Sequence, residues 1–422
     1  MTKKIIMFII LAILVVAIIA IGVYLIYKKA PSPSPAVFLD DSLATTEGVS
    51  SLVKANNQFA VDFYSKHSGD SNFFFSPYSV SGAMSMVYEG AKGDTSSQIA
   101  SVFHLPDVKV LESSSAKIYN EINKAGKSYS LNTANALWAQ KDYSFLPAYL
   151  QTVDKYYGGK LTNLDFVNNT ENSRTTINKY IEDKTNNKIK DLIPQGAVDS
   201  YTRLVLTNAI YFKGNWQKQF AKADTRQEDF NVSSGKIVKA DMMRLTGEDT
   251  RFKYTENDDV QVLNLPYQGN DLSMTLILPK AGKTVKDAEK YLSDQKLSGL
   301  KTDLQNTRID IYIPKFKLET KYFMKNDMSD MGMPSAFSDA ADFSGMTGSK
   351  DLKIGDVIHQ AFVQVDEEGT EAAAATAVVM TLNSAMPGTV KTFRADHPFL
   401  FVIQQNSTGN ILFLGRLDNP AK

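Results

Sequence analysis

The fold of this chain is decided by the stretch Glu367-Glu368-Gly369-Thr370-Glu371-Ala372-Ala373-Ala374-Ala375-Thr376-Ala377-Val378-Val379. Its alanines favour a surface helix, because alanine has the highest helix propensity. The β-branched residues near its end favour a strand instead. In a strand, alternate side chains share one face. That face would carry no charge, since it comprises Thr370, Ala372, Ala374, Thr376, Val378, Met380 and Leu382. The stretch is therefore either a helix or a segment that is able to enter a closely packed sheet.

Three further motifs settle this choice. The chain contains Asn72–Ser79 (NFFFSPYS), Thr207–Trp216 (TNAIYFKGNW) and, after the alanine stretch, Phe393–Phe401 (FRADHPFLF). These segments resemble, in order, the start of the second helix, the central strand and the C-terminal signature of the serpins. Glu367–Ala372 resembles the serpin hinge. The resemblance thus extends from about residue 50 to about residue 420.

The resemblance implies an α+β fold with three β-sheets, eight or nine helices and an exposed reactive-centre loop. The sequence pattern, with helices first and strands later, is also typical of an α+β protein. Thr95 and Gln98 have the spacing of a capping box at the start of a helix. Single strands are expected over Thr307–Lys317 and over Thr392–Gln404.

The resemblance also implies three groups of functional residues. The hinge is expected to comprise Glu367, Glu368, Gly369, Thr370, Glu371, Ala372, Ala373, Ala374 and Ala375. The shutter, a polar cluster beneath the centre of the main sheet, is expected to comprise Ser76, Ser79, Asn208 and His359. The breach, where the loop first enters that sheet, is expected to contain Trp216 and Lys315, which matches an ion-pair partner of Glu367. A solvated surface pair would contribute only about 0–1 kcal/mol.

The bond that a protease attacks follows from the register of the loop. Serpins usually place it about seventeen residues beyond the acid that matches Glu367, which gives Asn383–Ser384. A slip of one residue gives Leu382–Asn383. A large apolar residue suits chymotrypsin- or subtilisin-like serine proteases, whereas asparagine suits asparagine-cleaving cysteine proteases. The class of the target stays open.

The implied mechanism is that of a suicide inhibitor. A protease attacks the loop, and Thr370–Leu382 then enters the main sheet and carries the acylated protease with it. We expect the hinge to lie outside the sheet in the native form, with Thr370 as the first side chain buried on insertion. The alternatives are a non-inhibitory serpin, such as a chaperone or carrier, and a membrane-tethered solute-binding protein. The second would need parallel βαβ units, which the clustered strands do not suggest.

The N-terminus contains an uncharged apolar run from Ile5 to Tyr27. As a helix it would be about 34 Å long, enough to cross a bilayer. We expect a transmembrane signal anchor over residues 1–29, a Pro/Ser-rich linker over 30–49 and a serpin domain over 50–422, outside the cell. The alternative is a signal peptide that is cleaved, which would release a secreted protein.

Composition and the absence of known motifs argue against nucleic-acid binding, metal binding and enzyme activity. The chain has 46 basic and 46 acidic residues, so nothing points to nucleic acid. It has no cysteine, and its four histidines show no metal-ligand spacing. No GxSxG, HExxH, Walker or GxGxxG motif is present. We therefore expect no enzyme activity, metal or cofactor. The expected partners are a target protease and a membrane, and the protein is expected to be a monomer.

Overall fold

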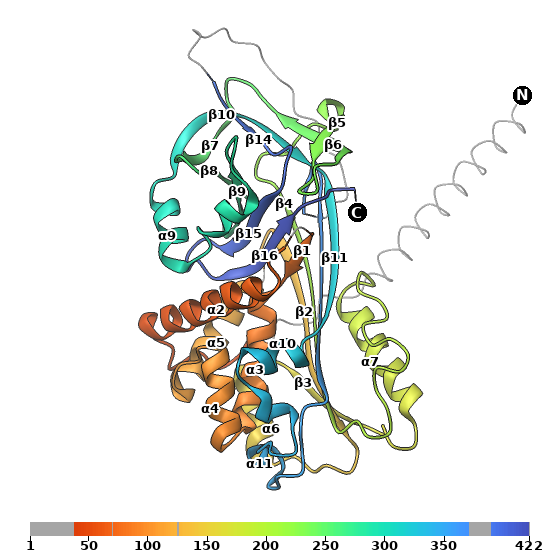
Figure 1. Ribbon diagram of the computed structural model, residues 1–422. Coiled ribbons are helices and arrows are strands. Elements are labelled where there is room, and N and C mark those ends of the chain that lie inside the picture. Colours follow the sequence, from red (N-terminus) through yellow and green to blue (C-terminus); the bar gives the residue numbers. More distant parts are fainter. Residues whose placement is uncertain (1–37, 70, 125, 371–389, 422) are drawn as a thin grey trace, which may run out of the picture. The chain divides into compact units, whose positions relative to one another are not determined.

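The structure is a computed structural model that describes residues 38–69, 71–124, 126–370 and 390–421. These residues belong to one compact unit, which begins at Phe38 (Figure 1). The described residues form ten α-helices, more than the eight or nine expected, and two 3-10 helices. The helices are α2 (Thr46–Lys66), α3 (Pro77–Gly90), α4 (Gly93–Val102), α5 (Val108–Asn123), α6 (Pro147–Tyr156), α7 (Thr170–Lys184), α8 (Val285–Glu289), α9 (Asp294–Thr302), α10 (Lys325–Met331), α11 (Ser344–Thr347), η1 (Lys222–Asp224) and η2 (Pro334–Phe337).

Residues 38–49, which were expected to form part of a linker, belong to this unit. Leu39 is buried, and its N–H and carbonyl group both bond to the side-chain amide of Asn120 at 2.9 Å. The expected anchor and the first part of the expected linker lie outside the described residues. Within the described ranges, no helix is long and apolar enough to cross a membrane.

The six-stranded sheet contains the beginning of the hinge. Its strand order is β11 (Phe316–Phe323), β12 (Asp356–Val365), β13 (Gly369–Thr370), β4 (Leu204–Asn215), β2 (Tyr129–Gln140) and β3 (Lys160–Leu164). Strands β12 and β4 are parallel neighbours along most of their length. At one end β13 lies between them, antiparallel to both, with Thr370 opposite Val365 and Gly214. Strands β12 and β4 are thus separated by β13 over two residues and pair directly with each other beyond them.

The other sheet has ten strands. Its order is β1 (Phe73–Phe75), β16 (Ile411–Leu417), β15 (Phe399–Gln405), β9 (Leu272–Pro279), β8 (Val260–Pro266), β7 (Arg251–Glu256), β10 (Gln305–Pro314), β6 (Ile237–Leu245) and β5 (Arg226–Asn231), with β14 (Lys391–Arg394) also beside β10. The first part of β10 pairs with β7, and its last part pairs with β6 and β14. The chain therefore has the three expected sheets. One is the six-stranded sheet, and the other two are joined through β10, which pairs with β7 in one and with β6 and β14 in the other.

Helices cover both faces of the six-stranded sheet. Adjacent residues of a strand point to opposite faces, and Leu137 and Trp138 of β2 illustrate the two sides. Leu137 belongs to the same apolar cluster as Met84 of α3. Trp138 belongs to the cluster that contains Ile177 and Ile181 of α7. In Figure 1, α7 accordingly stands on one side of this sheet and α3 on the other.

Two strands that were expected to be continuous are divided. The expected strand Thr307–Lys317 ends as β10 at Pro314 and restarts as β11 at Phe316, in the other sheet. Proline lacks an N–H donor and has a fixed φ, so it ends the hydrogen-bond ladder. The expected strand Thr392–Gln404 likewise forms β14 and β15, which Ala395–Pro398 separate.

The capping box expected at Thr95 and Gln98 is also wrong. Helix α4 begins at Gly93, so both residues lie within it. Their side chains instead accept backbone N–H groups of a distant loop, Thr95 from Asp342 at 2.9 Å and Gln98 from Ser335 at 3.0 Å.

Candidate functional site

The first four hinge residues are buried, and two of them, Gly369 and Thr370, lie within the six-stranded sheet as β13. Glu367 is 3% exposed and Thr370 is 0% exposed. The N–H groups of Trp216 and Phe220 donate to the carbonyl oxygens of Glu368 and Glu367, at 2.9 and 2.8 Å. The expectation that the hinge lies outside the sheet in the native form is therefore wrong for Gly369 and Thr370, which form β13.

Gly369 permits this close approach. A Cβ atom at this position would lie 2.1 Å from the carbonyl oxygen of Gly214 and 2.6 Å from Cα of Asn215. Both contacts are with backbone, which cannot rotate away as a side chain can. A residue with a side chain therefore cannot take this place without moving β13 away from β4.

Thr370 is held by a buried tyrosine that the sequence did not single out. The hydroxyl groups of Thr370 and Tyr267 are hydrogen-bonded at 2.7 Å. The ring of Tyr267 stacks on Trp216, with 4.6 Å between centroids and 14° between planes. Trp216 in turn donates from Nε1 to the carbonyl oxygen of Asp366 at 3.0 Å. Burial holds the pKa of Tyr267 far above its usual range, so its hydroxyl group keeps its proton.

Glu367 and Lys315 form the ion pair that the sequence predicts. Lys315 Nζ lies 3.0 Å from Glu367 Oε2, and Thr225 Oγ1 donates to Oε1 at 2.8 Å. The Glu367 side chain is only 4% exposed, so this is not a solvated surface pair. Burial alone would raise the pKa of Glu367, but its backbone N–H, Thr225 and Lys315 together lower it. Loss of Lys315 would leave a buried carboxylate without its cation, which is strongly unfavourable.

The structure brings all four predicted shutter residues together. Ser76 donates its N–H to His359 Nε2 at 3.1 Å, and its hydroxyl group to the carbonyl oxygen of Leu412 at 2.6 Å. Asn208 Nδ2 donates to the hydroxyl and carbonyl oxygens of Ser79 at 2.6 and 2.7 Å. The remaining contact joins His359 Nδ1 to Asn208 Oδ1. Since Nε2 accepts a hydrogen bond, Nδ1 must carry the ring proton and donate it to Asn208.

His359 is neutral in this environment. It is fully buried, and burial lowers its pKa to about 3, although the bond with Asn208 acts in the opposite direction. A second ring proton, on Nε2, would also point at the N–H of Ser76. Both effects favour the uncharged ring.

The shutter contains one residue that the sequence reasoning missed. Asn135 of β2 lies opposite Asn208 in the sheet, and its Oδ1 accepts from Asn208 Nδ2 and from the Ser79 hydroxyl group. Its signal in the sequence is an amide between Ala134 and Ala136, which point to the opposite face of the strand. The shutter thus joins β12, β4 and β2 to the start of α3.

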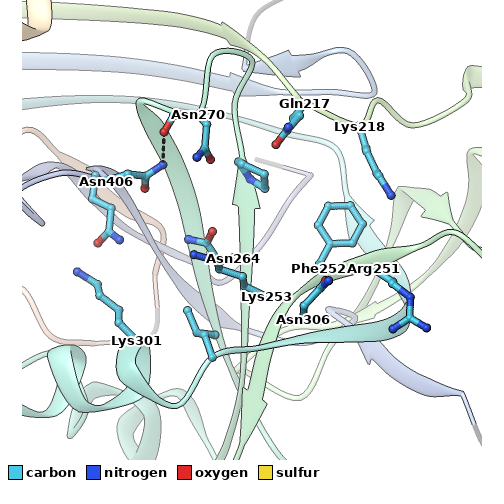
Figure 2. A pocket seen from close by; sticks show the side chains of 13 residues that line it. Gln217, Lys218, Arg251, Phe252, Lys253, Asn264, Asn270, Lys301, Asn306 and Asn406 are labelled. Atoms are coloured by element: carbon cyan, nitrogen blue, oxygen red, sulfur yellow. Dashed lines mark hydrogen bonds between the residues drawn. The ribbon is translucent and has the colours of Figure 1, made fainter.

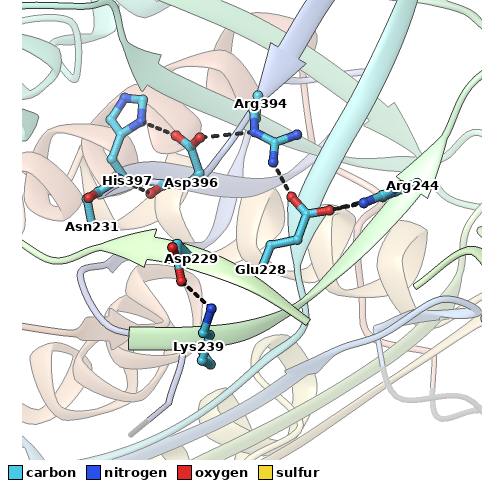
Figure 3. Close-up of polar contacts among 8 residues, drawn as sticks. All are labelled: Glu228, Asp229, Asn231, Lys239, Arg244, Arg394, Asp396 and His397. Atoms are coloured by element: carbon cyan, nitrogen blue, oxygen red, sulfur yellow. Dashed lines mark hydrogen bonds and ion pairs between the residues drawn. The ribbon is translucent and has the colours of Figure 1, made fainter. Parts of the chain in front are cut away.

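Charged groups hold the chain where it returns after the loop (Figure 3). Arg394 of β14 and Arg244 of β6 both pair with Glu228 of β5. Asp396 accepts from Arg394 at 3.1 Å and from His397 at 2.9 Å. His397 also contacts the carbonyl oxygen of Pro279 at 2.9 Å, so both of its nitrogens face acceptors. Burial lowers the pKa of His397, but these two acceptors raise it by more.

The remaining predicted site residues lie outside the described part of the chain. They are the hinge residues Glu371, Ala372, Ala373, Ala374 and Ala375 and the residues of the expected reactive bond, Leu382, Asn383 and Ser384. Within the described part, no group of histidine, aspartate and glutamate side chains could hold a metal ion.

Comparisons with known proteins identify the family. Residues 54–420 match the family model described as "Serpin (serine protease inhibitor)". An uncharacterised serpin-like protein of Methanosarcina mazei is 43% identical over 378 residues, which cover 87% of each chain. Human leukocyte elastase inhibitor is 41% identical, over 87% of this chain and 99% of its own. The crystal structure of human thyroxine-binding globulin has a TM-score of 0.80 at 28% identity and covers 89% of this chain and 100% of that one. This chain belongs to the serpin family.

Proposed function

We propose that this protein inhibits a serine endopeptidase as a suicide substrate. The observation that carries the proposal is β13, because Gly369 and Thr370 already pair with both β12 and β4. A strand that continues from Thr370 needs no new type of pairing. It only has to separate β12 from β4 over the part where they pair directly, from Phe362 to Asp356.

The register of β13 determines where the following residues would go. Thr370 lies opposite Val365 and Gly214. Each further loop residue moves one position back along both neighbours, since β13 is antiparallel to both. Thr376 would then lie opposite His359 and Asn208, because 365 − 6 is 359 and 214 − 6 is 208. It would share the inward face of Thr370, so that its hydroxyl group replaces part of the bond that insertion breaks.

The proposed trap couples this insertion to the chemistry of the protease. The protease nucleophile attacks the carbonyl carbon of Asn383, the bond to Ser384 breaks and the Ser384 amine leaves with a proton. Residues 371–382 then enter the sheet and extend the strand that begins at Thr370, so that its thirteen residues 370–382 span roughly 43 Å at ~3.3 Å each. The acylated protease would be carried across the domain. Distortion of its oxyanion hole would then slow hydrolysis of the ester.

The target class is part of the proposal. A bond after Leu382 suits a chymotrypsin- or subtilisin-like enzyme, whereas a bond after Asn383 suits an asparagine-cleaving cysteine protease, which is the alternative target. The similarity to human leukocyte elastase inhibitor supports an inhibitory role. A carrier is the rival function, because one similar structure is that of thyroxine-binding globulin in complex with thyroxine. The charge-free face expected from Thr370 to Leu382 favours the inhibitor.

We further propose that the protein is a monomer anchored in a membrane by residues 5–27, with the serpin domain outside the cell. The support is the length and hydrophobicity of that run in the sequence. Secretion after signal cleavage is the alternative.

Incubation with a panel of serine and cysteine proteases tests the inhibitor. The chain from Ser34 onward should form a protease complex that survives boiling in detergent. The released C-terminal peptide should begin at Ser384, or at Asn383 if the register slips. If every protease digests the loop and stays active, the proposal fails.

A further inference from the structure

The first described residues form a short segment whose apolar side chains face solvent. This entry segment, residues 38–43, follows the ten residues that connect it to the apolar run Ile5–Tyr27. Phe38 is 68% exposed and Leu43 is 76% exposed. Apart from Tyr201, no large apolar side chain of the described residues is more exposed. A single exposed apolar side chain is ordinary on a protein surface, but two within six residues can mark a contact surface.

The acidic side chains of the entry segment point toward the domain instead. Asp40 pairs with Lys155 of α6 at 2.9 Å, and Asp41 pairs with Lys117 of α5 at 3.5 Å. The two carboxylate side chains are 33% and 32% exposed, about half as much as Phe38. An ordinary surface segment exposes its charges and buries its apolar groups. Here the charges are paired against the helices and the apolar side chains are left outside.

The turn that presents Leu43 is held by hydrogen bonds. The N–H of Asp40 donates to a backbone carbonyl oxygen of α6 at 2.9 Å. Asp40 Oδ1 accepts from the N–H and the hydroxyl group of Ser42, at 3.1 and 2.6 Å. The N–H of Ala44 donates to the carbonyl oxygen of Asp41 at 3.0 Å. The exposure of Leu43 is therefore a property of an ordered turn and not of a loose chain end.

A cavity on the ten-stranded sheet offers the opposite kind of surface (Figure 2). It lies between the ends of β7, β8 and β15 and the end of α9, and most of its lining residues carry an amide or a positive charge. Lys218 and Arg251 lie on the same side of it. Such a surface would be drawn to anionic lipid headgroups by its charge, but it has little apolar area to bury. The entry segment and this cavity therefore differ in the lipids that they would contact.

We propose that the entry segment docks onto the lipid surface of the membrane that anchors the chain, with Phe38 and Leu43 inserted among the headgroups. This inference rests on the proposed membrane anchor. Ten residues, 28–37, connect Tyr27 to Phe38, and a chain of that length reaches at most about 36 Å. Docking is thus an intramolecular event at high effective concentration. Contact with lipid would remove the two apolar side chains from water.

Docking through the entry segment would leave the reactive loop accessible. The segment pairs with α5 and α6, which lie in the lower half of Figure 1. Strand β14, where the chain returns from the loop, lies at the top of the same view. A protease could then reach the loop while the domain stays on the membrane.

Spin labels on the full chain in phosphatidylcholine vesicles test this proposal. The chain has no cysteine, so Leu43→Cys places a single label at a known position. Ile237→Cys is the matched control, because Ile237 is 62% exposed and lies in β6 of the other sheet. The accessibility of the label to oxygen, divided by its accessibility to a water-soluble nickel complex, should be several-fold higher at position 43 than at position 237.

The same vesicles distinguish failure of docking from failure of the anchor. If the chain floats with the vesicles but both positions give the same ratio, the docking proposal is wrong and the anchor stands. If the chain does not float with them, the anchor is wrong and the docking proposal falls with it.

Two other outcomes would identify a different partner for the entry segment. Broadening of the spectrum by a second label at position 43 would mean that the segment contacts another copy of the chain. A raised ratio that needs added phosphatidylglycerol and is lost in high salt would mean attraction through basic residues. Either result overturns the proposal, because the insertion of Phe38 and Leu43 needs no anionic lipid.

Serine variants test the two apolar side chains themselves. A label at exposed Thr46, at the start of α2, should also report docking. Phe38→Ser with Leu43→Ser should lower its ratio to that of position 237, whereas Ile237→Ser should leave it unchanged. Neither variant should shift the unfolding midpoint, because all three side chains are exposed. An unchanged ratio at Thr46 in the double variant would show that Phe38 and Leu43 do not hold the domain on the lipid, and the proposal would be wrong.

Discussion

His359 of β12 lies directly opposite Asn208 of β4, and their side chains are hydrogen-bonded across the line where the sheet has to open. Above this pair β13 separates the two strands, whereas from Phe362 to Asp356 β12 pairs with β4 directly. A loop that enters from Thr370 must therefore break this bond on its way. The hydrogen bond between His359 and Asn208 therefore links β12 to β4 and opposes their separation.

The charge state of His359 makes the stability of this closure depend on pH. The folded pKa is about 3, well below the ordinary value of 6.5, because the ring is buried. The unfolded chain therefore takes up a proton below about 6.5 that the folded chain does not. The resulting stability is fully present above that pH and is lost as the pH falls toward 3. The expected slope is at most about 1.4 kcal/mol per pH unit.

Urea unfolding of His359→Gln between about pH 7 and pH 5 checks this. The free energy of unfolding of the variant should fall less steeply with pH than that of the wild type, by up to about 1.4 kcal/mol per pH unit. His397→Gln is the control with the opposite sign. The pKa of His397 is raised, so its contribution is present below the ordinary value and is lost as the pH rises through the folded one. Its removal should steepen the loss of stability in acid. If the free energy of unfolding changes with pH equally in wild type and His359→Gln, His359 is not the group that makes the stability depend on pH.

Gly369→Ala should expel β13 from the sheet. The new methyl group would lie 2.1 Å from the carbonyl oxygen of Gly214. We expect a loss of about 1–3 kcal/mol in the free energy of unfolding. We also expect a change in the fluorescence of Trp216, whose backbone N–H donates to the carbonyl oxygen of Glu368. The control is Gly299→Ala, because a Cβ there meets nothing within 4 Å. Equal stability of Gly369→Ala and wild type would mean that the hinge does not pass beside Gly214.

A double-mutant cycle measures the bond between Thr370 and Tyr267. Thr370→Val and Tyr267→Phe each leave one buried hydroxyl group without its partner, which should cost about 1–3 kcal/mol. The double variant removes both groups and should be less destabilised than the two single losses added together. Thr370→Arg should now destabilise the native fold as well as slow insertion, because Thr370 is buried before any protease acts. Strict additivity in the cycle would contradict the bond.

The membrane anchor predicts how the protein fractionates. The full chain should stay with membranes after carbonate extraction, and a protease added to intact cells should remove the serpin domain. The physical reason is the uncharged run Ile5–Tyr27, which is long enough to cross a bilayer. A soluble form that begins beyond Lys29 would instead identify a cleaved signal peptide.

The sequence predicted the shutter because its residues lie in recognisable motifs. It did not predict Asn135, Tyr267 or Thr225, because each completes a site through contacts between distant parts of the chain. Thr225, for example, bonds to Glu367 across 142 positions. Contacts of this kind leave no periodic signal in the sequence.

The errors in the expected elements have a related cause. Residues 307–317 have the alternation of one strand, but Pro314 ends β10 and the chain changes sheets. The predicted position of Gly369 and Thr370 was wrong, because residue types show that a segment is able to enter a sheet but not where it lies in the native form. The position of these two residues depends on Gly214 and Tyr267, which contact them only in the folded protein.

Thermal unfolding of the protein before and after cleavage at Asn383–Ser384 tests the central claim most directly. Insertion of residues 371–382 between β12 and β4 would extend β13 into a full central strand of the sheet. Since 1 kcal/mol shifts the midpoint of a domain of about 200 residues by roughly 2–4 °C, we expect the midpoint to rise by about 10 °C or more. A cleaved protein that unfolds at the same temperature as the intact one would show that the loop stays outside, and the proposed mechanism would be wrong.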